Sequence, residues 1–222
     1  ELTMFKRILI ANRGEMAVRI IRTCQELGIE AVAVYSDVDS TSLHVQLADY
    51  AVCIGAAKAA DSYLNMKNIL SAATALGCDA IHPGFGFLSE NSTFARLVEE
   101  CGMTFIGPSG DVIDMMGNKS MARQKMIEAG VPVVPGSDGS VNTLEEAKAC
   151  ADKIGYPVLI KASAGGGGRG MRKAFSEEEF EDAYLTAKAE AKACFGDDDM
   201  YLEKLILNPN HIEFQILADN YG

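Results

Sequence analysis

The sequence KASAGGGGRGM at residues 161–171 decides the interpretation of this chain. It follows the short apolar run PVLI at residues 157–160, which predicts a β-strand. Four consecutive glycines are costly to order, because glycine loses more backbone freedom on folding than any other residue. Such a run is kept where bare backbone must approach a ligand closely or must move. Successive backbone N–H groups can bind an anion, and Lys161 and Arg169 add positive charge, so the run is suited to binding phosphate. The alternative is a mobile surface linker.

The sequence around the glycine run predicts a second α/β unit. Capping boxes beginning at Thr143 and Ser176 predict helices that end at residue 154 and at about residue 195. The order strand, glycine turn, strand indicates that the glycines join a β-hairpin. The sequence HIEFQIL at residues 211–217 alternates apolar and polar side chains, which predicts a half-buried strand. Because no returning strand follows it, we expect the chain to be a fragment of a longer protein.

The first half of the chain alternates short apolar runs with segments of helical length. The expected strands are residues 7–11, 31–35, 51–54, 79–82 and 104–106. This rhythm predicts a parallel sheet with right-handed crossovers, so the fold class is α/β and the first domain is Rossmann-like. After residue 108 come two helical stretches, and the sequence VPVVPGS at residues 131–137 marks a domain boundary.

The composition narrows the class of protein. The chain has 222 residues, 48% of them hydrophobic, and a net charge of −11, which argues against nucleic acid or an anionic membrane as a partner. No apolar run reaches membrane-spanning length. Six cysteines without a C-x-x-C pattern indicate reduced thiols of a cytoplasmic protein. Three histidines without an H-E-x-x-H pattern predict no zinc site.

Two familiar nucleotide signatures are absent. Residues 12–15, NRGE, hold a single glycine where a nicotinamide-binding fold has G-x-G-x-x-G. Residues 116–120, MGNKS, separate the glycine from the lysine and do not form a P-loop.

Six motifs in order and spacing together carry a resemblance. They are IANRGE at 10–15 with Arg19, HPGFGFLSEN at 82–91, FIGP at 105–108, MGNK at 116–119, the glycine run at 161–171 and Glu203-Lys204. The chain resembles the biotin carboxylase family of ATP-grasp enzymes over essentially its whole length. The resemblance implies use of MgATP and bicarbonate to carboxylate biotin on a carrier protein, through carboxyphosphate.

The resemblance also implies a domain organisation and partners. The implied domains are a Rossmann-like domain at 1–108, a helical linker at 109–132, an ATP-grasp lid subdomain at 133–203 and the start of an incomplete ATP-grasp subdomain at 204–222. Implied partners are a biotin carboxyl carrier protein, a carboxyltransferase and a second copy in a homodimer. Arg22 and Glu26 match partner-contact positions, although an ion pair one helical turn apart explains them equally well.

The resemblance assigns ATP contacts residue by residue. The implied contacts are Lys119 and Lys161 with phosphates, Gly165, Gly166, Gly167 and Gly168 with Arg169 and Gly170 as the lid, Glu203, Lys204 and Leu205 with adenine, and His211 near the ribose. A closed lid would exclude water from the reactive intermediate. The alternatives are solvated lysines at 119 and 161, an ion-paired Glu203 and a structural His211.

The segment HPGFGFLSEN at residues 82–91, called loop 82–91 below, follows an expected strand at its carboxyl end, where ligands approach open α/β sheets. The resemblance places Gly86 and Glu90 near biotin and bicarbonate. Phe85 stands where the family more usually has tyrosine, so a phenol hydrogen bond is lost there. The Mg²⁺ ligands and the catalytic residues are expected beyond residue 222. We therefore assign no catalytic or metal residue and expect no turnover by this fragment alone.

Several parent proteins fit the resemblance. We favour the biotin carboxylase subunit of acetyl-CoA carboxylase, which serves fatty acid synthesis, over a domain of a pyruvate or acyl-CoA carboxylase. A carbamoyl-phosphate synthase half is a rival ligase, and loop 82–91 argues against it. A non-catalytic module for dimerisation or docking is the rival of a different class.

Overall fold

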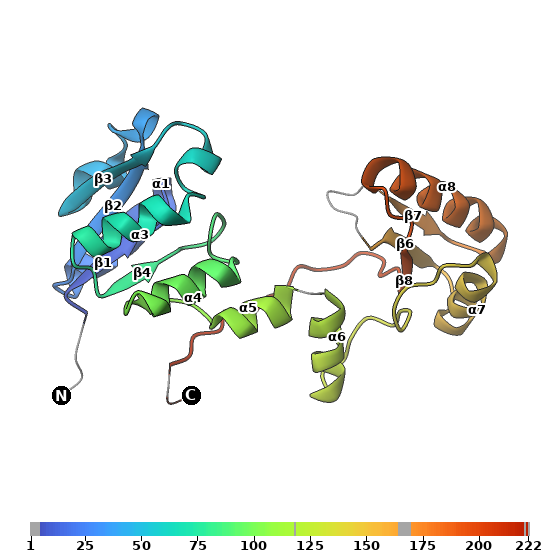
Figure 1. Ribbon diagram of the computed structural model, residues 1–222. Helices are drawn as coiled ribbons and strands as arrows, with labels where there is room; N and C mark the ends of the chain where they lie inside the picture. Colours follow the sequence, from blue (N-terminus) through green and yellow to red (C-terminus); the bar gives the residue numbers. More distant parts are fainter. Residues whose placement is uncertain (1–4, 118, 164–169, 220, 222) are drawn as a thin grey trace. The chain divides into compact units, whose positions relative to one another are not determined.

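The computed structural model describes residues 5–117, 119–163, 170–219 and 221, without the side chains of residues 119 and 120. The chain divides into two compact units, residues 1–124 and residues 125–222. Figure 1 shows both units along the chain, and each is described by itself.

Unit 1 contains a five-stranded parallel sheet. Its strands are β1 (Arg7–Ile10), β2 (Glu30–Ser36), β3 (Tyr50–Gly55), β4 (Ala80–His82) and β5 (Thr104–Phe105). Their order is β3-β2-β1-β4-β5, so the chain reverses its direction of travel across the sheet between β1 and β4. Ile8 pairs with Ala31 of β2 on one side and with Ala80 of β4 on the other. The carboxyl ends of β1 and β4 therefore lie side by side.

Helices cover both faces of this sheet. The helical segments of unit 1 are α1 (Gly14–Glu26), η1 (Asp37–Asp39), α2 (Leu43–Leu47), η2 (Ala59–Asp61), α3 (Met66–Ala75), α4 (Ser92–Glu100), α5 (Gly110–Gly117) and the first part of α6 (Lys119–Glu128). Leu9 and Ile81 pack with Ile69 of α3 and Phe94 of α4. Ile10 on the opposite face packs with α1. Successive side chains of one strand point to opposite faces of the sheet, so each central strand contributes to two hydrophobic cores, one under the helices on each face (Figure 1).

Unit 2 contains a three-stranded antiparallel sheet. Its elements are α7 (Leu144–Ile154), β6 (Val158–Ala162), β7 (Met171–Ala174), α8 (Glu177–Phe195) and β8 (Met200–Lys204). The strand order is β7-β6-β8, and β6 pairs antiparallel with both neighbours. Ile160 and Leu202 are fully buried and pack with Phe180 and Tyr184 of α8. Only this face of the sheet is covered by the two helices (Figure 1).

Most elements match the sequence prediction, including the parallel sheet and the β6–β7 hairpin. Two expectations are wrong. The Ser176 side chain makes no cap hydrogen bond; instead the Glu179 carboxylate accepts a hydrogen bond of 2.9 Å from the Phe175 N–H. Residues 211–217 form no strand in the described part of the chain, and Ile212, Phe214 and Ile216 are exposed. Alternation alone does not make a strand, because its backbone needs a pairing neighbour.

All six cysteines are free, in agreement with the sequence. None of the described helices is long and apolar enough to span a membrane.

Replacement of Thr143 by alanine should destabilise the start of α7. The Thr143 hydroxyl accepts a hydrogen bond from the Glu146 N–H at 3.2 Å, and the Glu146 carboxylate accepts one from the Thr143 N–H at 3.3 Å. Losing this capping box should cost about 0.5–2 kcal/mol. Hydrogen exchange of α7 amides measures the loss. Ser176→Ala is the matched control, because that side chain makes no cap bond to α8. Equal effects in α7 and α8 would contradict the assignment.

Candidate active site

The open face of the sheet in unit 2 carries polar side chains. Lys161 lies opposite Tyr201 and Leu159 lies opposite Glu203, so alternation places these four side chains on the face away from α7 and α8. The Lys161 ammonium donates to the Glu203 carboxylate at 2.5 Å, and Nζ lies 5.7 Å from the centre of the Tyr201 ring. The Lys161 and Glu203 side chains are 24% and 29% exposed. The pair is therefore partly desolvated and still accessible to a ligand.

The end of β8 is fixed by backbone contacts. The Lys204 ammonium donates to the carbonyls of Gly155 and Tyr156 at 2.9 and 2.7 Å. The Lys204 N–H donates to Pro135 at 2.7 Å, and the Leu205 N–H donates to Pro157 at 3.0 Å. Both N–H groups are already used in this structure. A planar base at this edge would find carbonyl acceptors and the Glu203 carboxylate, which suit an exocyclic amine.

The glycine run lies mostly outside the described residues, including Gly165, Gly166, Gly167, Gly168 and Arg169. Gly170 is described, with φ of +65°. Its carbonyl accepts from the Ala162 N–H at 2.8 Å, and a Cβ added at Gly170 would lie 2.8 Å from the Ala162 Cβ. Glycine is therefore needed at residue 170 both for its backbone angle and for close packing at the base of the hairpin.

Two other predicted ATP contacts are Lys119 and His211. Lys119 begins α6, and its side chain lies outside the described part. His211 is 86% exposed, and its Nε2 lies 3.0 Å from the Glu213 carboxylate. In the described part of the chain, His211 contacts none of the other predicted ATP residues.

Loop 82–91 of unit 1 begins where β1 and β4 end together. The Asn12 amide is buried and donates to the Pro83 and Phe85 carbonyls, each at 2.8 Å. A Cβ at Gly84 would lie 2.7 Å from the Asn12 Nδ2, so glycine permits this close approach. Gly86 has φ of +72°. Asn12 therefore fixes the first turn of the loop.

The exposed part of loop 82–91 is both apolar and acidic. Phe85 is 64% exposed and Phe87 is 37% exposed, while Leu88 is buried. Glu90 is exposed, and Asn91 caps α4 through the Phe94 N–H at 2.8 Å. The predicted site residues Gly86 and Glu90 thus lie on one accessible loop with two aromatic rings.

A partly buried polar network that the sequence analysis missed supports this loop. The Tyr63 hydroxyl donates to Asp39 at 2.6 Å and accepts from the Ser36 N–H at 3.0 Å. The Arg13 guanidinium contacts the same Asp39 oxygen at 3.2 Å. A signal for Ser36 and Arg13 was available, because Ser36 ends β2 and Arg13 lies in the turn after β1, and polar side chains at the carboxyl ends of parallel strands meet at one edge of the sheet. Tyr63 itself had no such signal.

The network shifts the pKa of its members. Burial and the hydrogen bond to Asp39 raise the pKa of Tyr63 to about 12. Desolvation alone would raise the pKa of Asp39, but hydrogen bonds from Tyr63 and Ser36 and the Arg13 charge together lower it. The tyrosine thus stays protonated and the carboxylate stays charged at neutral pH.

Two histidines of unit 1 are held neutral. Burial lowers the pKa of His44, although the Val34 carbonyl and Asp39 oppose the effect. His44 Nδ1 is buried and lacks a hydrogen-bond partner among the described residues. Burial also lowers the pKa of His82, whose Nδ1 accepts from the Gly84 N–H at 3.0 Å. Neutral His82 therefore carries its proton on Nε2.

The described residues contain no group of three or more His, Cys, Asp or Glu side chains that could hold a metal ion.

Comparisons with known proteins match both units. Residues 4–113 match the family described as biotin carboxylase, N-terminal domain, and residues 118–222 match the carbamoyl-phosphate synthase L chain, ATP binding domain. Biotin carboxylase 1 of Bacillus subtilis is 57% identical over 219 residues, which are 99% of this chain and 49% of that protein. The chain thus spans about half the length of the curated relatives it matches.

Solved structures agree with these matches. The biotin carboxylase domain dimer of Hydrogenobacter thermophilus 2-oxoglutarate carboxylase, in complex with MgADP, ADP and bicarbonate, is 54% identical with a TM-score of 0.76, covering 92% of this chain and 45% of that one. A biotin carboxylase complex with β,γ-ATP from Campylobacter jejuni is 50% identical with a TM-score of 0.80, covering 93% and 46%. Fold and matches define an ATP-grasp protein. The chain belongs to the biotin carboxylase family.

The neutral histidines predict that acid destabilises unit 1. With folded pKa values below the ordinary 6.5, the unfolded chain binds protons that the folded unit does not. Stability present above about pH 6.5 is therefore lost as the pH falls toward the folded pKa values. Hydrogen exchange of β2 and β4 amides at about pH 7.5 and about pH 5 measures the loss.

The controls separate His44 from general acid effects. His44→Gln should reduce the difference between the two pH values, because the replacement does not titrate. His211→Gln, at an exposed position in unit 2, should leave it unchanged. An unchanged pH difference in His44→Gln would show that burial of this histidine does not control the acid response.

Proposed function

We propose that the parent of this chain is a ligase that uses MgATP and bicarbonate to carboxylate biotin on a carrier protein, through carboxyphosphate. The observation that carries the proposal is Lys161, a partly desolvated lysine on the open face of a sheet at the base of the glycine hairpin. This region matches an ATP-binding domain, and related structures are named for MgADP, ATP and bicarbonate.

The residues of unit 2 fit a nucleotide. Lys161 would bind phosphate oxygens, because an ammonium offsets phosphate charge. Lys119, which belongs to unit 1, stays the second phosphate contact that the sequence predicts. The predicted lid comprises Gly165–Gly168, Arg169 and Gly170. Glu203 and the carbonyls at the end of β8 would accept hydrogen bonds from the exocyclic amine of adenine. His211 would lie near the ribose. When bound, ATP supplies the phosphoryl group that activates bicarbonate.

Lys161 must exchange partners for this role. In the structure its charge is compensated by Glu203 at 2.5 Å. A triphosphate offers more negative charge than one carboxylate, so the Lys161 side chain can rotate toward it. Glu203 would then accept a hydrogen bond from the exocyclic amine of adenine instead of from Lys161. The pair therefore holds the lysine side chain in a fixed orientation before the nucleotide arrives.

Loop 82–91 would border the sites of biotin and bicarbonate in the parent, with Gly86 and Glu90 as the nearest residues. Support comes from its position beside β1, where the sheet order reverses, since ligands bind open α/β sheets at such points. The exposed Phe85 and Phe87 rings offer apolar surface to a biotin ring system. Phe85 lacks a hydroxyl, so its contribution is packing alone.

We further propose that the parent is the biotin carboxylase subunit of a cytoplasmic acetyl-CoA carboxylase in fatty acid synthesis. Its partners would be a biotin carboxyl carrier protein, a carboxyltransferase and a second copy of itself. A related structure is named as a dimer, and Arg22 and Glu26 are both exposed on α1. A pyruvate, acyl-CoA or 2-oxoglutarate carboxylase is the alternative. The complete reading frame decides: a long continuation with a biotinyl-lysine motif would contradict the subunit.

Residues 1–222 by themselves are proposed to lack carboxylase turnover, since the curated relatives are about twice as long. ADP production from ATP, bicarbonate and free biotin by the purified 222-residue chain tests this. Clear turnover would overturn it.

A carbamoyl-phosphate synthase half is the second candidate, because residues 118–222 match a domain named for that enzyme. Both reactions consume bicarbonate and ATP. Dependence of ATP cleavage on biotin in the parent supports the biotin carboxylase, and indifference to biotin supports the alternative.

Lys161→Ala should weaken nucleotide binding by the parent protein roughly 10- to 100-fold, the range for a lost hydrogen bond between charged groups. Calorimetry with a non-hydrolysable ATP analogue measures it. Lys153→Ala, which removes an exposed lysine at the end of α7, is the matched control and should bind normally. Equal affinities of the two variants would favour a module that binds no ATP through this face.

A further inference from the structure

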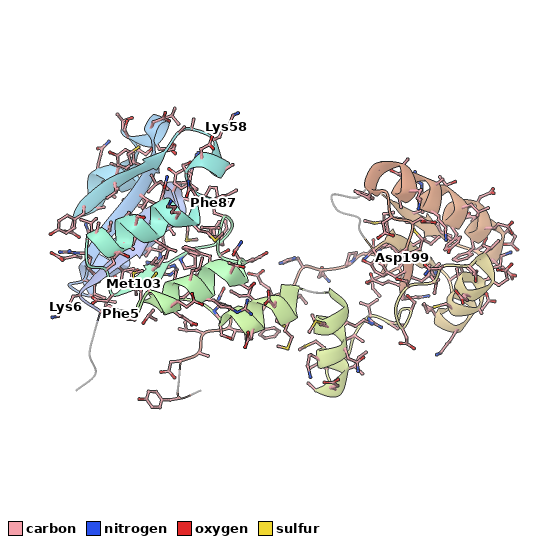
Figure 2. The ribbon with its side chains drawn as sticks, viewed as in Figure 1. Phe5, Lys6, Lys58, Phe87, Met103 and Asp199 are labelled. Carbon is pink, nitrogen blue, oxygen red and sulfur yellow. The ribbon has the colours of Figure 1, made fainter. Side chains whose placement is uncertain are left out.

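Loop 82–91 contains a backbone conformation that needs support. Phe87 has φ of +43°, a left-handed angle that costs free energy for a bulky side chain. Such a conformation persists only where the surroundings hold it. The ring of Phe87, labelled in Figure 2, stacks on Tyr63 with centroids 5.1 Å apart and planes inclined by 25°. Tyr63 is therefore the direct support of the strained residue.

Tyr63 is itself fixed from two strand ends. It is only 1% exposed, and its hydroxyl donates to Asp39 and accepts from the Ser36 N–H at the end of β2. Arg13, which follows β1, contacts Asp39 at 3.2 Å, and its guanidinium carbon lies 5.7 Å from the centre of the Tyr63 ring. Burial in the core of unit 1 also confines the ring itself, so the ring is a platform for Phe87 even apart from its hydroxyl bonds.

The two halves of the loop have separate supports. Asn12 holds the Pro83 and Phe85 carbonyls, and Tyr63 holds the Phe87 ring. Leu88 is buried in the core of unit 1, and the Ser89 N–H donates to the Gly86 carbonyl at 2.9 Å, so this half keeps some contacts of its own. Loss of the Tyr63 ring should therefore leave the first turn and the Leu88 anchor in place and loosen the backbone of residues 86–90 around Phe87. These residues include Gly86 and Glu90.

We propose that Tyr63 is a positioning residue, which holds Phe87 and with it the biotin-facing half of loop 82–91. This inference rests on the proposed function and adds a residue that contacts no substrate. Biotin is the substrate affected, because the released half carries the apolar surface of Phe87 beside an acidic Glu90, which suits a neutral ring better than an anion.

Two substitutions at residue 63 separate positioning from stability. Tyr63→Phe keeps the ring and removes both hydroxyl bonds, which leaves Asp39 and the Ser36 N–H short of a partner and lowers stability. Tyr63→Leu removes the ring as well. Phe94→Leu is the matched core control, since Phe94 is fully buried in unit 1 and stacks edge-on with Phe105 instead of with loop 82–91.

The experiment measures biotin-dependent ATP cleavage by the complete parent enzyme, together with thermal stability. Tyr63→Leu should raise the KM for free biotin roughly 3- to 10-fold, the range for one aromatic pair, with the KM values for ATP and bicarbonate nearly unchanged. Tyr63→Phe and Phe94→Leu should lower the melting temperature while the KM for biotin stays within about twofold of wild type. A KM for biotin that follows the melting temperature across all three variants would overturn the proposal.

Hydrogen exchange gives a readout that does not depend on activity. Amides of residues 86–90 should exchange faster in Tyr63→Leu, and normally in Tyr63→Phe and Phe94→Leu. Unchanged exchange in Tyr63→Leu refutes the positioning role even if the parent is a biotin carboxylase. If exchange is faster in Tyr63→Leu but ATP cleavage by the parent does not depend on biotin, the proposed function and the substrate named here are refuted. The role of Tyr63 in holding Phe87 would still be supported.

Discussion

The number of sheet faces that helices cover determines where each unit can bind a ligand. In unit 1, α1 covers one face and α3 and α4 cover the other, so every central strand is buried on both sides. Chemistry is then confined to the loops that follow the strands. In unit 2, helices cover only the face that carries Ile160 and Leu202. The opposite face is free to present Lys161 and Glu203 directly from strands.

The sequence predicted the elements whose signals are local. The alternating apolar runs located all five strands of unit 1, and the glycine run located the hairpin. The capping box at Thr143 is present, but the one at Ser176 is not, because Glu179 accepts from Phe175 without help from the serine. The strand predicted at 211–217 is wrong for a similar reason. A strand depends on a pairing partner, which its own alternation does not supply.

The site was less predictable, because its contacts join distant residues. The register between β6 and β8 brings Lys161 to Glu203, although 42 residues separate them along the chain. Glu203 is thus ion-paired in this structure, which is the alternative that the sequence left open for this residue. Tyr63 lies in a turn without regular pattern, and its partners Asp39 and Phe87 lie 24 residues before and after it along the chain. No local pattern encodes such contacts. The roles of the ATP and biotin residues stay predictions.

The pairing of Lys161 with Glu203 compensates a cation that the sheet partly removes from water. The chain has 31 acidic and 20 basic residues, and strand register places one of these carboxylates beside the Lys161 ammonium. The Glu203 carboxylate offsets part of the desolvation cost and holds the ammonium at the base of the hairpin. The carboxylate also competes with any bound anion for the ammonium, so a ligand with more negative charge than one carboxylate would be favoured at Lys161. Strand register thus fits this face to the polyphosphate proposed above.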